Sequence, residues 1–448
     1  MIRMPSDWVV LNTSDLIQEK RLEIGDGYRA KNSEMGSSGL PFIRAADVDG
    51  YIEFSRADVL SDYSVSKAGD KISRPGDVVL TAKGSVGRFA YVKPETPRFI
   101  YSPQLAYWRV RNPHFIDSRF LFFWMHGAEF ARQIHRVKGL TDMADYVNLA
   151  DQRRMTITLP PFPTQVRIAS ILSTYDDLIE NNRRRIQILE EMPRAIYREW
   201  FVHFRFPGHE EVEVVDSQMG EIPQGWTLSP FTALADFQNG YAFAPQHWQK
   251  EGKPIVKIAE MKKGIGGTTS YYHGEDIPAE YHITTRDLLF AWSATLCVGF
   301  WTGGDALLNQ HIFRVLPKKG YSKAFLLHSL EHRIPEFQSR TQGTTMRHIR
   351  RSALDEVVLP IPPEPLLSMF DELVVPMVEL RINLRLMNRT LSQARDLLLR
   401  KLVSGEIDVS HLDLGAALPD TRQTSKYKEQ SNLDEWTDGD DQDVDKGR

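Results

Sequence analysis

Two short segments of the chain combine glycine with positively charged side chains. Residues 83–88, Lys-Gly-Ser-Val-Gly-Arg, place two cations beside two glycines, and residues 136–141 place Arg136 and Lys138 beside Gly139. Glycine lets another backbone approach closely, and lysine and arginine neutralise phosphate charge. These residue types are typical of a surface that binds the phosphate backbone of a nucleic acid.

Both segments have counterparts in the second half of the chain. Residues 292–295, Trp-Ser-Ala-Thr, correspond to the first and lack a cation, whereas residues 342–351 hold three arginines and a histidine behind a Gly-Thr-Thr turn. Gln104 and Gln310 add amides, which can bond adenine in two places. Any one of these loops taken alone is best interpreted as an ordinary surface turn. Because similar loops recur at matching places in both halves, the set favours binding. The predicted DNA-binding residues are Lys83, Gly84, Ser85, Arg88, Gln104, Lys138, Gly139, Thr141, Ser293, Gln310, His311, Gly343, Thr344, Thr345, Arg347 and His348.

Motifs for nucleotide or metal binding are missing from the sequence. No Gly-x-x-x-x-Gly-Lys-[Ser/Thr] loop occurs, and residues 264–267 are glycine-rich without dinucleotide spacing, which favours a hairpin turn. His328 and His332 are four apart, but Glu331 is misplaced for a His-Glu-x-x-His zinc site. We therefore expect no metal and no cofactor in this chain.

Two weak likenesses to catalytic motifs carry little weight. Asp236 with residues 251–253 resembles a nuclease Asp…Glu-x-Lys trio, but the first half has Ser-Gly-Leu at the matching place. Residues 160–162 resemble an amino-methyltransferase Pro-Pro-aromatic loop without its leading Asp or Asn. The sequence thus predicts no catalytic residue.

The binding loops belong to a duplication that covers most of the chain. Pro-x-x-Trp stands near the start of each half, at Pro5 and Pro223, and a Gly-x-Pro motif follows at residues 39–48 and 252–261. In each half an acidic residue then leads an apolar run, a Gln opens a strand-like run, and Leu-Pro precedes a long helical pattern. Two copies of one module suit a protein that recognises two similar things at a fixed separation.

Each copy mixes strand-like and helical patterns. Residues 77–80, 89–92 and 105–110 are β-type runs, and residues 115–137 and 322–337 are helical stretches. The expected fold class is α/β, with two similar modules.

A heptad pattern follows each Leu-Pro. Helices with matching apolar seams bury them most simply against each other, so we expect two long antiparallel coiled-coil-like helices between the modules. Asn182 is the polar exception, Pro193 should end or kink the first helix, and residues 404–405 should stop the second. The seam positions are Ile168, Leu172, Tyr175, Ile179, Asn182, Ile186, Leu189, Pro193, Ile196 and Trp200, then Phe370, Leu373, Met377, Leu380, Leu384, Met387, Leu391, Ala394 and Leu398.

Bulk composition is neutral on nucleic-acid binding. The net charge is −4, but residues 411–448 hold ten acidic and five basic residues, which leaves 49 acidic and 50 basic residues for the rest. That tail has the composition of a disordered segment. The single Cys297 fits a reducing, cytoplasmic location, and we expect no membrane span or secretory signal.

In this order the motifs resemble the specificity (S) subunits of type I restriction–modification systems. The resemblance covers residues 1–410. It rests on the duplication, the Gly-Glu-Ile-Pro-Gln-Gly-Trp segment at 220–226, residues 177–182 and 200–204 in the centre, and residues 398–407 at the end. The acidic tail is outside the pattern.

The resemblance implies a non-catalytic subunit that gives its partners their DNA specificity. Each module would bind one half of a split, asymmetric DNA sequence, and the helices would set the gap and dock methyltransferase (M) subunits, two per chain. Those subunits use S-adenosylmethionine, and added restriction (R) subunits use ATP and Mg.

Two rival hypotheses stay open on the residues alone. One is a self-contained methyltransferase or nuclease with a degenerate motif, and the other is a helical protein-binding scaffold without nucleic acid. The expected organisation is a first target-recognition domain at 1–158, a central spacer helix region at 159–206, a second target-recognition domain at 207–358, a distal spacer helix region at 359–405 and the tail at 411–448.

Overall fold

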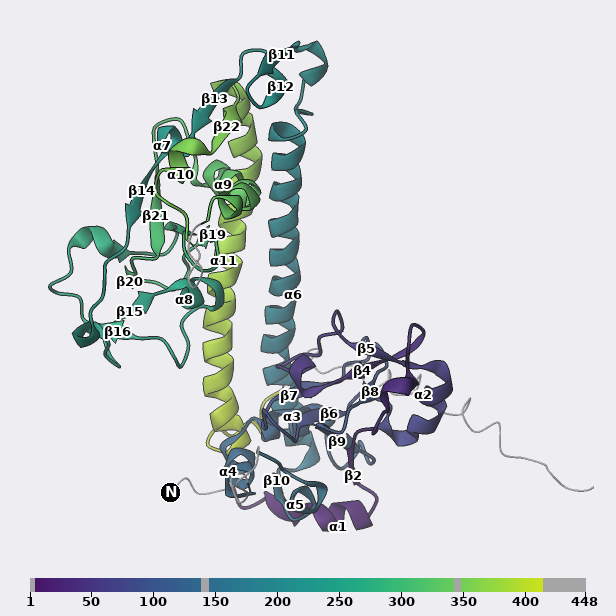
Figure 1. Cartoon of the computed structure of the whole chain (residues 1–448). Helices are drawn as coiled ribbons and strands as arrows, with labels where there is room; N and C mark the ends of the chain where they lie inside the picture. Colours follow the sequence, from purple (N-terminus) through teal and green to yellow (C-terminus); the bar gives the residue numbers. More distant parts are fainter. Residues whose placement is uncertain (1–4, 138–144, 342–347, 414–448) are drawn as a thin grey trace, which may run out of the picture. The chain divides into compact units, whose positions relative to one another are not determined.

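The computed structural model describes residues 5–137, 145–341 and 348–413. The chain divides into two compact units, one made of residues 1–177 and 392–448 and the other of residues 178–391 (Figure 1). Most of the predicted acidic tail lies outside the described residues. Each unit contains one β-rich module and parts of both long helices.

The first module, which precedes the first long helix, is built on two four-stranded sheets. The antiparallel sheet has the order β2-β9-β6-β7, and the second sheet, β3-β5-β4-β8, has one parallel pair, β4 with β8. A separate antiparallel pair, β1 with β10, joins the module's ends. The strands are β1 Val9–Asn12, β2 Leu22–Asp26, β3 Met35–Gly36, β4 Gly39–Ile43, β5 Asp58–Ser61, β6 Val78–Thr81, β7 Phe89–Tyr91, β8 Ile100–Tyr101, β9 Leu105–Val110 and β10 Thr156–Leu159; the helices are α1 Thr13–Gln18, α2 Asp62–Ala68, α3 Ser118–Met125, α4 Ala128–Val137 and α5 Leu149–Arg153.

The second module, which follows α6 (Phe162–Phe201) and precedes α11 (Glu364–Val403) in the sequence, repeats this topology. Its antiparallel sheet is β14-β21-β18-β19, its mixed sheet is β16-β15-β20-β17 with β15 and β20 parallel, and β13 pairs with β22. The strands are β11 Val214–Ser217, β12 Gly220–Pro223, β13 Thr227–Pro230, β14 Ala235–Asn239, β15 Lys253–Val256, β16 Tyr271–Tyr272, β17 His282–Ile283, β18 Leu288–Ala291, β19 Cys297–Phe300, β20 Ala306–Leu308, β21 Ile312–Pro317 and β22 Val358–Ile361; the helices are α7 Phe231–Leu234, α8 Ile258–Lys263, α9 Lys323–Ser339 and α10 Ala353–Glu356.

The duplicated glycines of the Gly-x-Pro motif have the same structural reason in both modules. Gly39 begins β4 and Gly252 directly precedes β15, with φ values of +132° and +113°. A Cβ on Gly39 would lie 1.9 Å from the Leu60 carbonyl oxygen, and one on Gly252 would lie 2.5 Å from the Tyr272 backbone. Both positions therefore require glycine, which explains why the motif occurs twice.

The acidic residue before each apolar run anchors a buried ion pair. In the first module Arg109 binds Asp77 through Nε and Nη2, at 2.7 and 2.8 Å, and the Tyr101 hydroxyl donates to the same carboxylate at 2.7 Å. Burial by itself lowers the pKa of Arg109, but the bonds to Asp77 outweigh it, so the pKa ends above its ordinary value. In the second module Arg314 Nη2 lies 3.0 Å from Asp287.

Two sequence-based expectations about local structure are wrong. The single helix expected at 115–137 is two helices, α3 and α4, interrupted at residues 126–127. The glycines at 264–267 do not form a hairpin turn: Gly264 ends α8, with φ +81°. A glycine in the left-handed region caps a helix as readily as it forms a turn, and the sequence alone does not separate the two.

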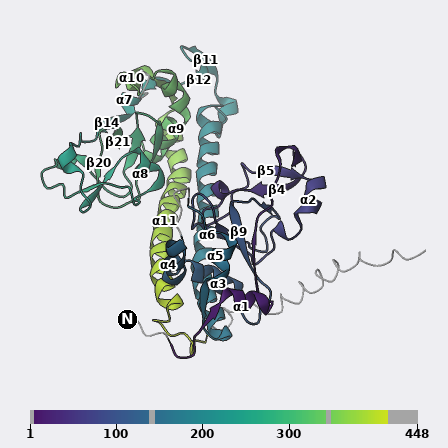
Figure 2. The same cartoon turned by 60° about the horizontal axis from the view of Figure 1, so that its bottom comes forward.

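The two long helices are confirmed, each 40 residues in length. α6 runs over Phe162–Phe201 and α11 over Glu364–Val403, followed by Gly405 at φ +76°. In the second unit they pack side by side and antiparallel (Figures 1 and 2): Asn182 Nδ2 donates to Asn388 Oδ1 at 2.9 Å, and Glu190 pairs with Arg385. Pro193 lies inside α6 and does not end it.

The seam predicted for α11 is only partly correct. Leu373, Leu380 and Met387 are 47%, 40% and 48% exposed, whereas Val374 and Val378 are buried in the core of the second module. The heptad pattern assumed one buried face directed at α6, but α11 also covers its own module. The positions of the α6 seam are buried or half-buried, but Ile168 and Leu172 belong to the core of the first module and Trp200 to that of the second.

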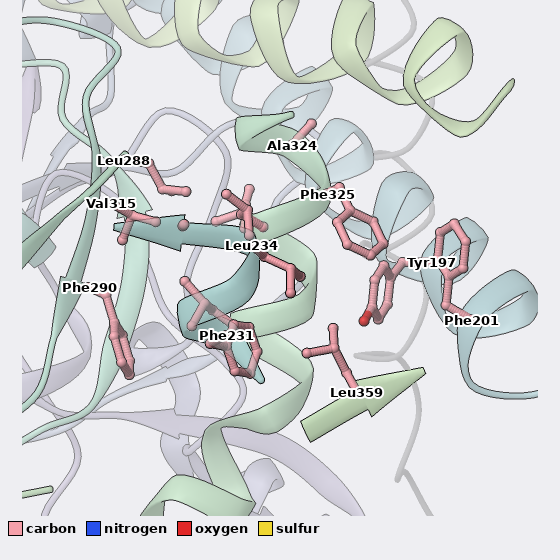
Figure 3. Close-up of a cluster of buried hydrophobic side chains, with 14 of the residues drawn as sticks. Tyr197, Phe201, Phe231, Leu234, Leu288, Phe290, Val315, Ala324, Phe325 and Leu359 are labelled. Carbon is pink, nitrogen blue, oxygen red and sulfur yellow. The ribbon is translucent and has the colours of Figure 1, made fainter. Parts of the chain in front are cut away.

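A core of aromatic and aliphatic side chains joins the second module to the parts of α6 and α11 that lie in the same unit (Figure 3). Phe325 on α9 faces Tyr197 and Phe201 on α6, with ring centroids 6.0 and 5.3 Å away. Phe231 and Phe290 lie deeper in the module and are fully buried. This core holds the sheet that carries the second set of predicted binding residues. The predicted α/β class, with two modules and two long antiparallel helices, is confirmed.

Candidate nucleic-acid interface

In the first module, three separate segments meet at one end of the β2-β9-β6-β7 sheet. The loop after β6 begins with Ala82, whose N–H donates to the Gln104 carbonyl at 2.8 Å and whose carbonyl accepts from Val147 N–H at 2.9 Å. Lys83 forms an isolated antiparallel bridge with Tyr146. The loop after β6, the residue before β9 and the segment at 145–147 are therefore held together.

The loop after β6 exposes its lysine. Lys83, Gly84 and Ser85 are exposed, and Gly84 and Gly87 have φ values of +83° and +96°. Lys83 Nζ lies 6.0 Å from the ring centroid of Tyr146, which is 47% exposed. The lysine can therefore reach an external anion.

Arg88 has a different environment from Lys83. It is half-buried, and its Nη2 donates to the Ala45 carbonyl at 2.7 Å. Ala45 N–H in turn donates to Gln104 Oε1 at 3.3 Å. The prediction grouped Arg88 with the phosphate-binding cations, but its guanidinium bonds to the protein backbone.

The second module assembles the matching three segments. Trp292 N–H donates to the His311 carbonyl at 3.2 Å, and Ile349 N–H donates to the Trp292 carbonyl at 3.1 Å. Ser293 forms the isolated bridge with His348. The loop after β18, the residue before β21 and the segment at 348–349 therefore repeat the first module's arrangement.

Strand register shows which residues correspond. Thr81 pairs with Leu105 in the first module, and Ala291 pairs with Ile312 in the second. The residue before β9 is Gln104, and the residue before β21 is His311. The sequence alignment, which matched Gln104 with Gln310, was one residue off because shared residue type was given more weight than register.

The matched positions carry unlike side chains. Ser293 occupies the position in the second module that Lys83 occupies in the first. It is 2% exposed, and among the described residues its Oγ has no hydrogen-bond partner. The Trp292 indole is half-buried and lies 5.8 Å from the ring centroid of His311 and 6.2 Å from that of His348. The first interface thus presents a cation, an amide and a phenol, and the second presents imidazoles beside an indole.

Seven of the predicted binding residues are outside the described part of the chain. They belong to the two Gly loops that directly precede the bridging residues Tyr146 and His348, and they are Lys138, Gly139, Thr141, Gly343, Thr344, Thr345 and Arg347. The residues that follow each Gly loop, 146–147 and 348–349, form backbone hydrogen bonds or bridges with the loops after β6 and β18. Sequence reasoning missed Tyr146, because residues 139–146 and 343–348 differ in length and give no alignment signal.

The weak catalytic likenesses gain no support. Among the described residues, no group of three or more His, Cys, Asp or Glu side chains could hold a metal ion. His328 is 1% exposed, its Nδ1 lies 3.1 Å from Glu331 Oε2, and burial lowers its pKa. Asp236 pairs with Lys318, and Lys253 Nζ lies 3.1 Å from His282 Nδ1. Asp236 and Lys318 are an exposed surface pair, and His328 is a buried histidine paired with Glu331.

No helix within the described ranges is long and apolar enough to cross a membrane.

Comparison with known proteins gives one consistent family. The family described as "Type I restriction modification DNA specificity domain" matches residues 5–191 and 223–365, which is one match for each module. The MjaIX specificity subunit of a type I restriction enzyme from Methanocaldococcus jannaschii is 24% identical over 434 residues, covering 92% of this chain and 96% of that protein. The HindI specificity subunit from Haemophilus influenzae is 20% identical and covers 87% of this chain and 99% of that protein.

The fold agrees with a solved structure of the same kind. The crystal structure of the type I restriction–modification S subunit from M. genitalium superposes with a TM-score of 0.54 at 13% identity, and the match covers 89% of this chain and 96% of that one. The duplicated module, the paired long helices and the family match on both halves agree. The chain therefore belongs to the type I restriction–modification DNA specificity family, as a non-catalytic specificity subunit with two target-recognition domains.

Proposed function

We propose that each module recognises one half of a split, asymmetric DNA sequence. The observation that carries the proposal is the pair of interfaces: the same three segments meet in both modules, but the side chains at matched positions differ. Phosphate contacts position a protein on DNA, whereas contacts to base edges select the sequence. Unlike side chains on a common backbone would select unlike half-sites.

We assign contacts with DNA to the predicted residues other than the buried Ser293 and Arg88, which bonds to the Ala45 carbonyl, with Lys83 as the exposed phosphate contact in the first module. Lys138 and Arg347 lie outside the described residues, and their DNA contacts are proposed from the sequence alone. We propose modules at 1–158 and 207–358, as predicted from the sequence; the strands β10 and β22, which close the modules, run on to Leu159 and Ile361.

The helices α6 and α11 would set the unread gap between the half-sites. Asn182, 1% exposed, bonds Asn388 across the pair, and a buried polar pair of this kind fixes the register of two helices. Deleting one heptad from each helix should therefore change the length of the gap and leave both half-sites unchanged. An altered half-site with a constant gap would contradict this role.

The same helices would dock the methyltransferase subunits. Met369, Leu373, Leu380 and Met387 are 40% to 48% exposed and, at spacings of four and seven residues, lie on one face of α11. Exposed apolar rows on a helix are typical of protein interfaces. The complex would contain two M subunits, which use S-adenosylmethionine, and R subunits, which use ATP and Mg, and would act in the cytoplasm on double-stranded DNA.

The test is modified-base sequencing of DNA from cells that express this chain with its M subunit, against cells that lack only this chain. We expect a split, asymmetric methyladenine motif that disappears with the chain. A motif that persists without the chain would overturn the proposal. If neither strain has a motif although the M subunit copurifies with the chain, the proposal fails as well.

A further inference from the structure

The loop after β18 lacks the cation that Lys83 provides in the first module. Its residue at the matched position is the buried Ser293, and residues 292–297 contain no lysine or arginine. A DNA backbone that meets both modules in the same way would therefore need a positive charge from another segment of the second module. The last turn of α8 carries two lysines, Lys262 and Lys263.

The end of α8 packs beside the start of β19. Met261 and Ile265, which flank the two lysines, pack against the core that contains Ala291, the last residue of β18. Cys297, the first residue of β19, pairs with Ala291. Burial raises the pKa of the Cys297 thiol and the Lys262 ammonium opposes that rise, so the ammonium lies near the thiol. Lys262 is therefore at the end of the sheet that carries the second interface.

The first module supports this placement through a different contact. The duplicated Gly-x-Pro motif ends at residues 48 and 261, so Asp49 and Gly50 occupy the places of Lys262 and Lys263. Gly50 N–H donates to the carbonyl of Phe89 at 3.0 Å, at the start of β7, which is the counterpart of β19. Asp49 is exposed. The same point of the fold thus carries an acid in the first module and a lysine in the second.

Both lysines are exposed and available to an external anion. Among the described residues, neither Lys262 nor Lys263 forms an ion pair or a hydrogen bond. Other lysines of the second module are bonded within it, and four of them are Lys253, Lys257, Lys318 and Lys323.

The glycine-rich loop after α8 leaves open space beside the lysines. A Cβ added at Gly264, Gly266 or Gly267 would meet no atom within 4 Å beyond its chain neighbours. The loop is nevertheless held in place, because Thr269 Oγ1 accepts from Gly266 N–H at 2.9 Å and donates to the buried Glu260 at 3.2 Å. Glycines in such a loop let a phosphate approach the backbone closely.

We propose that Lys262 and Lys263 contact DNA phosphates at the half-site of the second module, in place of the cation missing after β18. The inference rests on the proposed function. The first module would hold the DNA backbone through the loop after β6, and the second through the end of α8. Phosphate contacts position a protein without selecting bases, so these lysines would set the affinity and leave the recognised sequence unchanged.

The test is the salt dependence of DNA binding by the full complex, with Lys262→Ala and Lys263→Ala combined. Each phosphate contact contributes about 0.9 to the slope of log K against log salt, so the slope should fall by about 1.8. The methylation motif should stay the same. An unchanged slope would overturn the proposal.

Two controls separate a local contact from a general effect of charge or shape. Lys319→Ala removes an exposed lysine beyond the opposite end of β21, about 20 Å along the strand from the interface, and should leave the slope unchanged. Lys262→Arg combined with Lys263→Arg keeps both charges and should also leave it unchanged. A fall as large as that of the double alanine variant, in either control, would contradict the assignment.

Neutral methylphosphonate linkages identify the half-site that the lysines contact. When such linkages replace the phosphates of one half-site at a time, the effect of the double alanine variant should disappear for one half-site only. The effect of Lys83→Ala should disappear for the other half-site. If both effects disappear with the same half-site, the assignment of these lysines to the second half-site is wrong.

Failure of the inference can be distinguished from failure of the proposed function. If the unaltered chain directs a split methylation motif but the double alanine variant keeps the full salt slope, only the role of the two lysines is overturned. If the unaltered chain directs no motif, the proposed function itself has failed.

Discussion

The two modules share a backbone and differ in what they present at the same place on it. Both have a loop after a central strand, a residue before the neighbouring strand and a segment after a Gly loop, joined by equivalent hydrogen bonds. The first module places Lys83, Gln104 and Tyr146 at these positions, and the second places Ser293, His311 and His348. The backbone hydrogen bonds that join the three segments are kept in both modules, while the side chains at the matched positions differ in type and exposure.

The buried ion pairs give the largest expected difference between the modules. Asp77→Asn removes the nearest carboxylate partner of Arg109, which is 4% exposed; Glu23 and Asp70 stay 3.7 and 3.9 Å away, so we expect a loss of about 3 kcal/mol of stability. Asp287→Asn should cost only about 1–2 kcal/mol, because the Arg314 side chain is 25% exposed and water can solvate it. Native-state hydrogen exchange, resolved by peptide, measures both in the full chain. Equal losses in the two units would contradict the assigned burial difference.

The charge difference between the loops should appear in the salt dependence of DNA binding. Lys83→Ala removes one exposed cation, so the slope of log K against log salt should fall by about 0.9. Ser293→Ala, the matched variant, removes no charge and should leave the slope unchanged. Binding of the assembled complex to its methylation site is measured between about 50 and 200 mM salt. A slope that does not change for Lys83→Ala would remove this residue from the phosphate contacts.

The smallest expected effect concerns the backbone of the same two loops. Gly84 and Ala294 occupy equivalent left-handed conformations, at φ +83° and +54°. A non-glycine residue in this conformation costs the folded state about 1–2 kcal/mol. Glycine avoids that cost, but it loses more backbone entropy on folding, which offsets part of the gain. Gly84→Ala should therefore destabilise the first module by about 1 kcal/mol, and Ala294→Gly should stabilise the second by a few tenths of that amount. Thermal unfolding of the two variants checks the opposite signs.

The sequence predicted architecture better than it predicted geometry. The duplicated landmarks correspond to real constraints, such as the positive φ of Gly39 and Gly252 and the buried carboxylates of Asp77 and Asp287, which is why the two modules could be aligned. The α11 seam was partly wrong because a heptad pattern does not say which of two neighbours, α6 or the module core, covers a helix face.

The candidate site shows the same limit more sharply. Lys83 is exposed as a binding residue should be, but Ser293 is buried and Arg88 bonds to a backbone carbonyl. The correspondence of Gln104 with His311 depends on strand register, which the sequence does not display. Residue types suggested the surface, and only tertiary bonds separate a side chain that faces outward from one that supports its neighbour.

The most direct test of independent recognition compares the methylation motifs of two double variants. One carries Lys83→Ala and Gln104→Ala in the first module, and the other carries His311→Ala and His348→Ala in the second. We expect each variant to relax one half of the split motif, a different half in each case, with the other half and the gap preserved. Changes in both halves from either variant, or the same half relaxed by both, would contradict the proposal that each module recognises its own half-site.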